Sequence, residues 1–418
     1  MSKDAWGYQE PNRRPAPDWQ VNPQTSQVRA GLTRTGFGET SEALFLNSGF
    51  TYSSAQEAED SFIDETDHFV YSRFGNPTIA MFENRLAELE GAELCVATGS
   101  GMSAMFASVA CMVKAGDRVV ATAAMFSSCH VVLTEFLPAW GVEVELVAGT
   151  DPAVWAKALD RPTKVVFIES PSNPLMEIVD IRMISDLAHK VGATVIVDNV
   201  MASPIMQRPL ELGADVVMYS ATKHIDGQGR VLAGAVLGSF SYINEYFKPF
   251  FRHTGPAISP FNAWVLLKSL ETLDMRVERM AKNAQRVAKF LATRPEISVV
   301  SFPGLPSHPG HELAKKQMTG FGTTIGITFK GTKKDVFKFM DALRIIDISN
   351  NLGDSKTLIT HPASTTHRRL SAEDQAAMGI TPTTLRLSVG LEHSDDLIKD
   401  IAQEIGRASC RERVSSPV

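Results

Sequence analysis

Short apolar segments alternate with amphipathic segments through the middle of the chain. Segments 164–169, 193–198 and 215–220 are apolar without polar alternation, which is typical of strands covered by helices on both faces. The alternation predicts an α/β domain over residues 77–260, with a mainly parallel sheet flanked by helices. The expected strands are 94–98, 118–122, 142–147, 164–169, 193–198, 215–220 and 232–238, and the helices between them cover 102–114, a segment toward 140, 153–159 and 181–191.

The pattern changes after about Pro260. A long helical stretch over 263–293 precedes a strand at 323–329, a helix at 334–343, a strand at 385–389 and a closing helix. This order predicts a second, smaller α+β domain at the C-terminus, over residues 261–403.

The first 76 residues are rich in Gly, Ser, Thr, Asn and Pro and show little periodicity. They predict an extended N-terminal arm with at most a short helix at 55–62. The first clear helix begins at Pro77, a residue suited to a first helical turn. Its expected buried face carries Ile79, Phe82, Leu86 and Leu89.

The C-terminal residues 404–418 form a separate case. The segment Glu404 to Val414 reads EIGRASCRERV, which can be encoded by a sequencing-library adapter. We treat 404–418 as a suspected non-native tail and exclude it from fold and function reasoning.

The composition excludes several classes of protein. Lys and Arg (41) are outnumbered by Asp and Glu (47), and no long block of like charge occurs, which argues against nucleic acid as a partner. Met1 to Asp18 is polar and no apolar run reaches the length of a membrane span, so we expect a cytoplasmic protein without a membrane partner. Four cysteines, none at metal-ligand spacing, argue against a metal site and a disulfide framework.

A lysine follows one of the expected strands. The segment Ser220-Ala221-Thr222-Lys223-His224 comes directly after the apolar run that ends at Tyr219, and the carboxyl ends of parallel strands are where α/β sheets bind ligands. Lys223 there could form a Schiff base while Ser220 and Thr222 bind a phosphate. A surface lysine at the start of a loop is the alternative.

Asp198 ends the expected strand that starts at Ala193, 25 residues before Lys223. The two side chains could therefore emerge from neighbouring strand ends. A pyridine nitrogen that must stay protonated needs such a carboxylate. A helix N-cap or loop aspartate is the alternative.

A glycine-containing loop, Gly99-Ser100-Gly101-Met102-Ser103-Ala104, lies between a strand and a helix. The free N–H groups and the dipole of a helix N-terminus favour a phosphate at such a place. The loop also fits a dinucleotide-binding pattern, but Ala123 and Ala124 stand where an acidic ribose partner is expected after the next strand. This argues against NAD.

Together these segments resemble the Cys/Met-metabolism family of PLP-dependent enzymes, of fold type I, along nearly the whole chain. The matching segments are 71–78 (YSRFGNPT), 100–104 (SGMSA), 169–174 (ESPSNP), 197–199 (VDN), 220–223 (SATK), 361–364 (HPAS) and 385–390 (LRLSVG). The resemblance implies pyridoxal 5'-phosphate as cofactor and small-molecule substrates.

The resemblance also implies a role for each matching residue. Lys223 holds the cofactor covalently and moves protons, Asp198 pairs with the pyridine nitrogen, and Arg386 binds the substrate α-carboxylate with Asn173 assisting. Tyr71 and Arg73 reach the phosphate of a neighbouring subunit. The active form is then a homo-oligomer, with a dimer as the minimum and a tetramer as the expected assembly. The phosphate is held by Gly101, Met102, Ser220 and Thr222.

One position departs from the family pattern. Many members place a tyrosine over the pyridine ring, but this chain has Phe126 there. Phenylalanine can stack but has no hydroxyl to move a proton. Proton transfer then falls on Lys223, with Tyr71 as a second candidate.

Within the family, four segments are most similar to the O-succinylhomoserine sulfhydrylase branch: 34–40, 223–230, 253–256 and 350–354. Other branches typically have a serine where Asn351 stands, which makes Asn351 a candidate substrate-binding residue. The branch implies replacement of the γ-substituent of O-succinylhomoserine by sulfide, giving homocysteine and succinate in methionine biosynthesis. Cystathionine γ-synthase, O-acetylhomoserine sulfhydrylase, a γ-lyase and a non-catalytic PLP-binding protein remain alternatives.

Overall fold

The computed structural model describes residue 19 and residues 21–63 and 66–412, with side chains as far as residue 403. The expectations about Met1 to Asp18 and about the last residues of the suspected tail, 413–418, concern residues outside these ranges. The backbone of 404–412 continues the last helix.

A seven-stranded sheet forms the centre of the molecule, in the order β1-β7-β6-β5-β4-β2-β3. Only β7 runs antiparallel to its neighbours, and the remaining pairs are parallel, so the predicted mainly parallel sheet is confirmed. The strands are β1 (Leu94–Thr98), β2 (Arg118–Thr122), β3 (Glu143–Val147), β4 (Val165–Glu169), β5 (Thr194–Asp198), β6 (Val216–Tyr219) and β7 (Gly234–Gly238).

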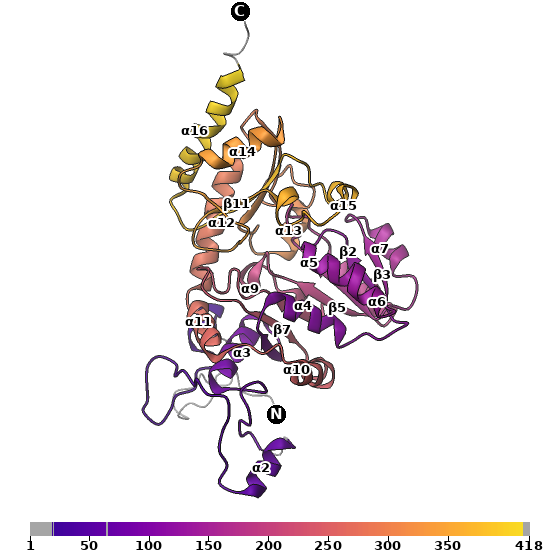
Figure 1. Cartoon of the computed structure of the whole chain (residues 1–418), viewed down its shortest axis with the longest axis vertical. Helices are drawn as coiled ribbons and strands as arrows, with labels where there is room; N and C mark the ends of the chain where they lie inside the picture. The colour runs from indigo at the N-terminus through magenta and orange to yellow at the C-terminus, as the bar shows by residue number, and fades with distance from the viewer. Residues whose placement is uncertain (1–18, 20, 64–65, 413–418) are drawn as a thin grey trace, which may run out of the picture.

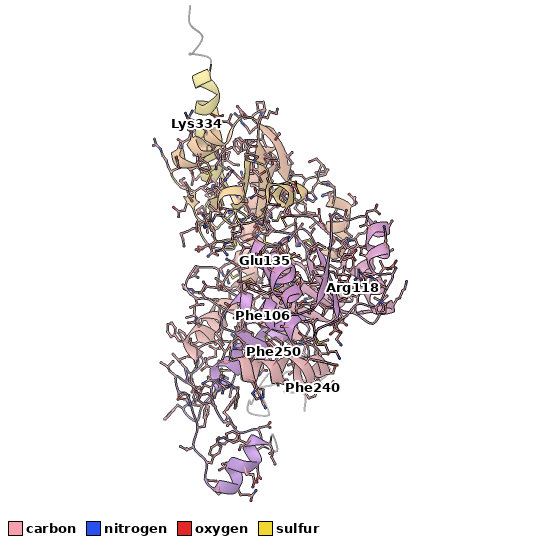
Figure 2. All side chains as sticks on the ribbon, turned by 45° about the vertical axis from the view of Figure 1, so that its right-hand side comes forward. Phe106, Arg118, Glu135, Phe240, Phe250 and Lys334 are labelled. Atoms are coloured by element: carbon pink, nitrogen blue, oxygen red, sulfur yellow. The ribbon has the colours of Figure 1, made fainter. Side chains whose placement is uncertain are left out.

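The apolar strands are buried because helices cover both faces of this sheet (Figure 1). Successive side chains of β4 point to opposite faces. Val165 and Phe167 therefore belong to a core shared with α4 (Gly101–Ala110), whereas Val166 and Ile168 belong to a core shared with α7 (Pro152–Ala158) and α8 (Ile181–Lys190). On the first side, Phe106 of α4 and Phe250 of α10 (Lys248–Thr254) are labelled near each other in Figure 2. Their rings are in edge-to-face contact, with centroids 6.2 Å apart.

The described helices have the following bounds: α1 (Pro23–Arg29), α2 (Ala55–Phe62), α3 (Pro77–Glu90), α4 (Gly101–Ala110), α5 (Ser127–Val131), the π-helix η2 (Val132–Phe136), α6 (Leu137–Ala139), α7 (Pro152–Ala158), α8 (Ile181–Lys190), α9 (Ser203–Met206), η3 (Pro209–Leu212), the π-helix η4 (Tyr242–Phe247), α10 (Lys248–Thr254), α11 (Pro260–Leu270), α12 (Leu273–Leu291), α13 (His311–Gln317), α14 (Lys333–Ala342), η5 (Pro362–Ser364), α15 (Ala372–Ala377) and α16 (Ser394–Glu412). All the described helices are too short or too polar to cross a bilayer.

Helix α3 begins at Pro77, as its sequence predicts. The Asn76 side chain accepts a hydrogen bond from the Thr78 N–H, and Pro77 occupies the first turn. At the other end, Gly91 adopts a φ of 77°, a left-handed conformation that glycine adopts without a steric cost. The predicted apolar face is buried, from Ile79 to Leu89.

A second sheet has five strands in the order β10-β11-β12-β9-β8. Its strands are β8 (Ile297–Ser301), β9 (Thr324–Phe329), β10 (Asp347–Ile348), β11 (Leu358–Thr360) and β12 (Thr384–Ser388). Strands β9 and β12 were predicted from the sequence, whereas β8, β10 and β11 were not. The two helices predicted in this part of the chain are confirmed by α14 and α16.

The long helix expected over 263–293 is wrong in one respect, because α11 and α12 are separate helices. The Ser269 carbonyl accepts hydrogen bonds from the Thr272 N–H and the Arg276 guanidinium. The Ser269 carbonyl therefore does not take part in the hydrogen-bond ladder of a continuous helix. Thr272, between the two helices, has a non-helical φ of −124°.

The N-terminal arm lies along the body and extends beyond it, with α2 at the lower end of the molecule in Figure 1. Helix α2 confirms the expected short helix at 55–62, whereas α1 was not predicted. Several large apolar side chains of the arm are exposed, among them Phe37 (98%), Leu46 (69%) and Phe62 (62%). Exposed apolar surface of this extent is typical of a face that another molecule covers.

Candidate active site

A cavity of about 400 Å³ opens at the carboxyl ends of the parallel strands. Ten of the predicted site residues line it: Gly101, Met102, Phe126, Asn173, Asp198, Ser220, Thr222, Lys223, Asn351 and Arg386. They come from several strand ends and from the second sheet, so both parts of the chain build the cavity. The contribution of the second sheet explains why residues far apart in sequence meet here.

Lys223 lies just beyond the end of β6, as predicted. Its Nζ donates a hydrogen bond to Asn351 Oδ1 at 2.6 Å. Burial, assisted by the positive charge of Arg386, lowers the pKa of Lys223 to about 8. A much larger share of this amine is therefore unprotonated near neutral pH than for an ordinary lysine, and the unprotonated form is the nucleophile and base.

Asp198 ends β5, which is the parallel neighbour of β6. The two residues therefore emerge from neighbouring strand ends, as the sequence predicted. Asp198 Oδ1 accepts a hydrogen bond from the Val200 N–H at 3.0 Å. Burial raises the pKa of this carboxyl to about 7.

Glu169 pairs with Asp198 across the β4–β5 ladder. Burial and the neighbouring Asp198 raise the pKa of Glu169. Its two oxygens accept hydrogen bonds from the Phe126 N–H at 2.7 Å and the Asn173 N–H at 2.6 Å. Two adjacent buried carboxylates favour a cation between or beside them.

The glycine-containing loop caps α4, as expected. The Ser100 hydroxyl accepts a hydrogen bond from the Ser103 N–H at 3.0 Å. A Cβ placed on Gly101 would lie 2.4 Å from Ser220 Cβ, so only glycine lets these two segments approach. The helix N-terminus and the Ser220 hydroxyl thus form a narrow cradle that suits a phosphate. Thr222 lines the same cavity, and its hydroxyl is hydrogen-bonded to the backbone of Ala233.

Arg386 lies on β12 and is 2% exposed. Its Nη1 donates to Asn173 Oδ1 at 3.0 Å, and its Nη2 donates to the carbonyls of Asn350 and Asn351 at 2.8 and 3.1 Å. Its Nε is buried without a hydrogen-bond partner in the described structure. A buried guanidinium with one unmet donor is suited to bind a carboxylate.

Tyr71 and Arg73 do not line this cavity. Tyr71 is 42% exposed, and the Arg73 guanidinium lies 4.6 Å from the Phe74 ring centroid and donates to the Arg252 carbonyl. Their predicted role toward the phosphate of a neighbouring subunit is untested by a single chain and stays a prediction.

Among the polar residues that line the cavity, Glu169, Asn350 and Thr366 were not predicted as site residues. Glu169 could have been predicted from the sequence, because it ends an apolar strand just as Asp198 does. Asn350 and Thr366 belong to loops of the second sheet, and no local pattern in the sequence places these loops against β6.

A buried polar network holds the strand ends from behind. Tyr219 donates to Glu90, and the Asn199 amide donates to the Tyr219 hydroxyl at 2.6 Å. Gln207 links Asn199 to the Ser170 carbonyl, with bonds of 2.9 and 2.6 Å. The network joins residues adjacent to Glu169, Asp198 and Ser220, and so stabilises the spacing of these three site residues.

Known proteins resemble the chain over nearly its whole length. Residues 24–405 match the family described as Cys/Met metabolism PLP-dependent enzyme. The chain belongs to this family. The resemblance inferred from the motifs, fold type I and the cofactor pyridoxal phosphate are thereby confirmed.

Individual members of the Cys/Met metabolism family are close to the chain. O-succinylhomoserine sulfhydrylase from Mycobacterium tuberculosis is 52% identical over 385 residues, which cover 91% of this chain and 95% of the relative. O-succinylhomoserine sulfhydrylase from Pseudomonas aeruginosa is 46% identical, covering 91% and 94%. The solved structure of cystathionine gamma synthase from Xanthomonas oryzae pv. oryzae, in complex with aminoacrylate and cysteine, has a TM-score of 0.89 and 35% identity, covering 94% and 100%.

The cavity fits the cofactor of this family. The cradle at Gly101 would hold the phosphate, Lys223 would hold the aldehyde carbon, and Asp198 would face the pyridine nitrogen. A protonated ring nitrogen beside Asp198 would favour the ionised form of this buried carboxyl, because opposite charges attract. Phe126 lines the same cavity and offers an apolar ring for stacking.

We expect Glu169→Gln to weaken cofactor binding, because the amide keeps only one accepting oxygen and leaves the Phe126 or Asn173 N–H without a partner. The expected rise in the dissociation constant of pyridoxal phosphate is roughly 10-fold, from one buried N–H left without a hydrogen-bond partner. Absorbance titration of the cofactor-free protein measures it. Glu177→Gln, a half-buried residue that does not line the cavity, is the matched control, and equal affinities for the two variants would refute the positioning role.

Proposed function

We propose that this chain is an O-succinylhomoserine sulfhydrylase, which replaces the succinyloxy group at Cγ of O-succinylhomoserine with sulfide and releases homocysteine and succinate. The observation that carries the proposal is the cavity in which Lys223, Asp198 and the unmet donor of Arg386 converge. The relatives of that name at 52% and 46% identity support the same activity. The product assigns the enzyme to methionine biosynthesis by direct sulfhydrylation.

The substrate is held by its amino-acid end. The planar fork of Arg386 binds the α-carboxylate, and the Asn173 amide, already bonded to Arg386 Nη1, assists. This orients the Cα hydrogen toward Lys223. Asn351, which accepts a hydrogen bond from Lys223 Nζ, keeps the amine directed into the cavity.

Lys223 moves the protons of the reaction. When bound, pyridoxal phosphate supplies an electron sink that makes the Cα and Cβ hydrogens of the substrate acidic. Lys223 Nζ takes the Cα proton, and removal of a Cβ proton then expels succinate from Cγ. Sulfide adds at Cγ, a proton returns to Cβ, and Lys223 returns a proton to Cα. Phe126 has no hydroxyl, so it cannot share this proton transfer.

The proposal includes a homodimer as the minimum active unit, a tetramer as the expected assembly, and a cytoplasmic location. The exposed apolar arm supports a dimer, because Phe37 and Leu46 need a cover. Tyr71 and Arg73 on this arm would complete the phosphate site of the partner subunit. Measuring the molar mass in solution together with hybrid-dimer complementation between Arg73→Ala and Lys223→Ala tests this assembly.

A second candidate function is cystathionine γ-synthase, because a solved enzyme of that name shares the fold at 35% identity. That reaction uses cysteine and must hold a second carboxylate and ammonium beside the first substrate. Sulfide needs no such groups. The two functions differ only in the nucleophile and therefore in the product.

We expect sulfide to give homocysteine with a kcat/KM at least ~10-fold above that for cysteine giving cystathionine, a ratio that needs only about 1.4 kcal/mol of differential transition-state binding. Competition of both nucleophiles for limiting O-succinylhomoserine, with products separated by chromatography, measures the ratio. Cystathionine as the main product would identify the chain as a synthase. No turnover with either nucleophile would favour a PLP-binding protein without this activity.

A further inference from the structure

A second cavity, of about 780 Å³, lies beside the cofactor cavity. The two cavities share three lining residues, Met102, Phe126 and Thr366. The shared residues include the ring expected to stack on the cofactor. A substrate group that projects past Phe126 would therefore enter this second cavity.

The second cavity has apolar walls, and its charged lining residues are all positive. Phe106, Phe136 and Trp140 contribute aromatic walls, with Phe106 and Trp140 in edge-to-face contact at 5.7 Å. The charged residues that line it are Arg368 and Arg369, and no carboxylate lines it. Such a lining suits an anion carried on a short hydrocarbon chain.

The two arginines lack a carboxylate partner among the described residues. In the described part of the chain, neither guanidinium has an Asp or Glu oxygen within salt-bridge distance, and both residues are exposed. Arginines elsewhere on the surface form such pairs, for example Arg286 with Asp395 at 2.6 Å. The pair therefore offers two unneutralised positive charges to the cavity.

The backbone that carries the arginines is fixed. The Thr366 carbonyl accepts a hydrogen bond from the Ser127 hydroxyl, and the Gln375 amide donates to the His367 carbonyl at 3.0 Å. His367 itself is fully buried. Since the flanking residues are held, binding an anion would order only the two side chains.

We propose that Arg368 and Arg369 bind the distal carboxylate of the O-acyl group of the substrate, so that this chain selects a dicarboxylic acyl ester over an acetyl ester. This inference rests on the proposed function. The two methylenes of a succinyl group would lie against the aromatic walls, while its carboxylate would reach the guanidinium forks. An acetyl ester has no group for either contact.

The test compares kcat/KM for O-succinylhomoserine and O-acetylhomoserine, each with sulfide, in the wild-type enzyme and in Arg368→Met, Arg369→Met and the double variant. Loss of hydrogen bonds to a charged group predicts a decrease of roughly 10- to 100-fold for the succinyl ester in the double variant. The value for the acetyl ester should change less than about 2-fold. Calorimetric titration with succinate gives a readout without turnover, and its affinity should fall in parallel.

Lys334→Met is the control for removing a surface positive charge. Lys334 is exposed on α14. It lies in the upper part of the molecule in Figure 2, whereas Phe106 lies near the middle, and this variant should keep the wild-type ratio. An unchanged succinyl-to-acetyl ratio in the double variant, or a wild-type preference for the acetyl ester, overturns the arginine subsite and leaves the sulfhydrylase proposal intact. Failure of the wild-type enzyme with both esters instead refutes the proposed function.

Discussion

Replacing Lys223 with alanine is expected to lower turnover by at least ~10³-fold, because one residue supplies both the covalent attachment and the proton transfer. The fold should be retained, since the side chain ends in the cavity and its one hydrogen bond goes to Asn351. The variant should also lose the absorbance near ~420 nm that a lysine-bound pyridoxal phosphate gives, and borohydride should no longer fix the cofactor to the protein. Both spectra and turnover are measured on the same preparation.

The pH dependence gives a separate measure of the same amine. Burial and Arg386 lower the pKa of Lys223 to about 8. Attachment of pyridoxal phosphate to the cofactor-free protein should therefore speed up as pH rises toward about 8 and level off above it. Lys190→Ala, an exposed lysine on α8, is the control and should behave as the wild-type enzyme. Borohydride fixation that persists in Lys223→Ala would contradict the assignment.

The elements that border the site were predictable because their sequences carry unambiguous local signals. An apolar strand that ends in a polar residue occurs at Asp198 and again before Ser220, and parallel strands deliver such residues to one edge. The α4 N-terminus was predictable for the same reason, since Gly101 follows a strand and precedes an apolar helix. These residues needed no knowledge of distant contacts.

The contacts between the two sheets could not be read from local patterns. Lys223 and Asn351 are 128 residues apart and Arg386 and Asn173 are 213 apart, and periodicity says nothing about which loops meet. The short strands β10 and β11 have two and three residues, too few for an alternating pattern to appear. The break between α11 and α12 depends on Arg276, whose partners include the distant carbonyls of His224 and Ile225.

The motif resemblance supplied what periodicity could not. It brought Arg386 and Asn173 into the site, and both line the cavity with the expected neighbours. It did not indicate Glu169 as more than part of a matching segment, although this carboxylate holds the backbone of Phe126 and Asn173. A residue that acts through the backbone of its neighbours has no signature in its own side-chain type.

Asp198→Asn is expected to separate catalysis from cofactor binding. The asparagine has the same shape, and its oxygen can still accept the Val200 N–H, so cofactor content should stay within about 2-fold of the wild-type level. Turnover should fall roughly 100-fold or more, because an amide cannot stabilise a protonated ring nitrogen and the ring then becomes a weaker electron sink.

The comparison that decides the role of Asp198 is between two quantities from one preparation, the bound cofactor measured by absorbance after alkaline release and kcat with saturating substrate. Asp180→Asn is a matched control, because the Asp180 carboxylate also accepts one backbone N–H, that of Met183 at 2.9 Å, but caps α8 away from the cavity, and asparagine caps helices as well as aspartate does. If Asp198→Asn lost cofactor and turnover equally and mildly, the carboxylate would be a structural residue of the strand end. A large loss of turnover with the cofactor still bound can come only from the charge that the amide removed, since shape and hydrogen bonding are preserved.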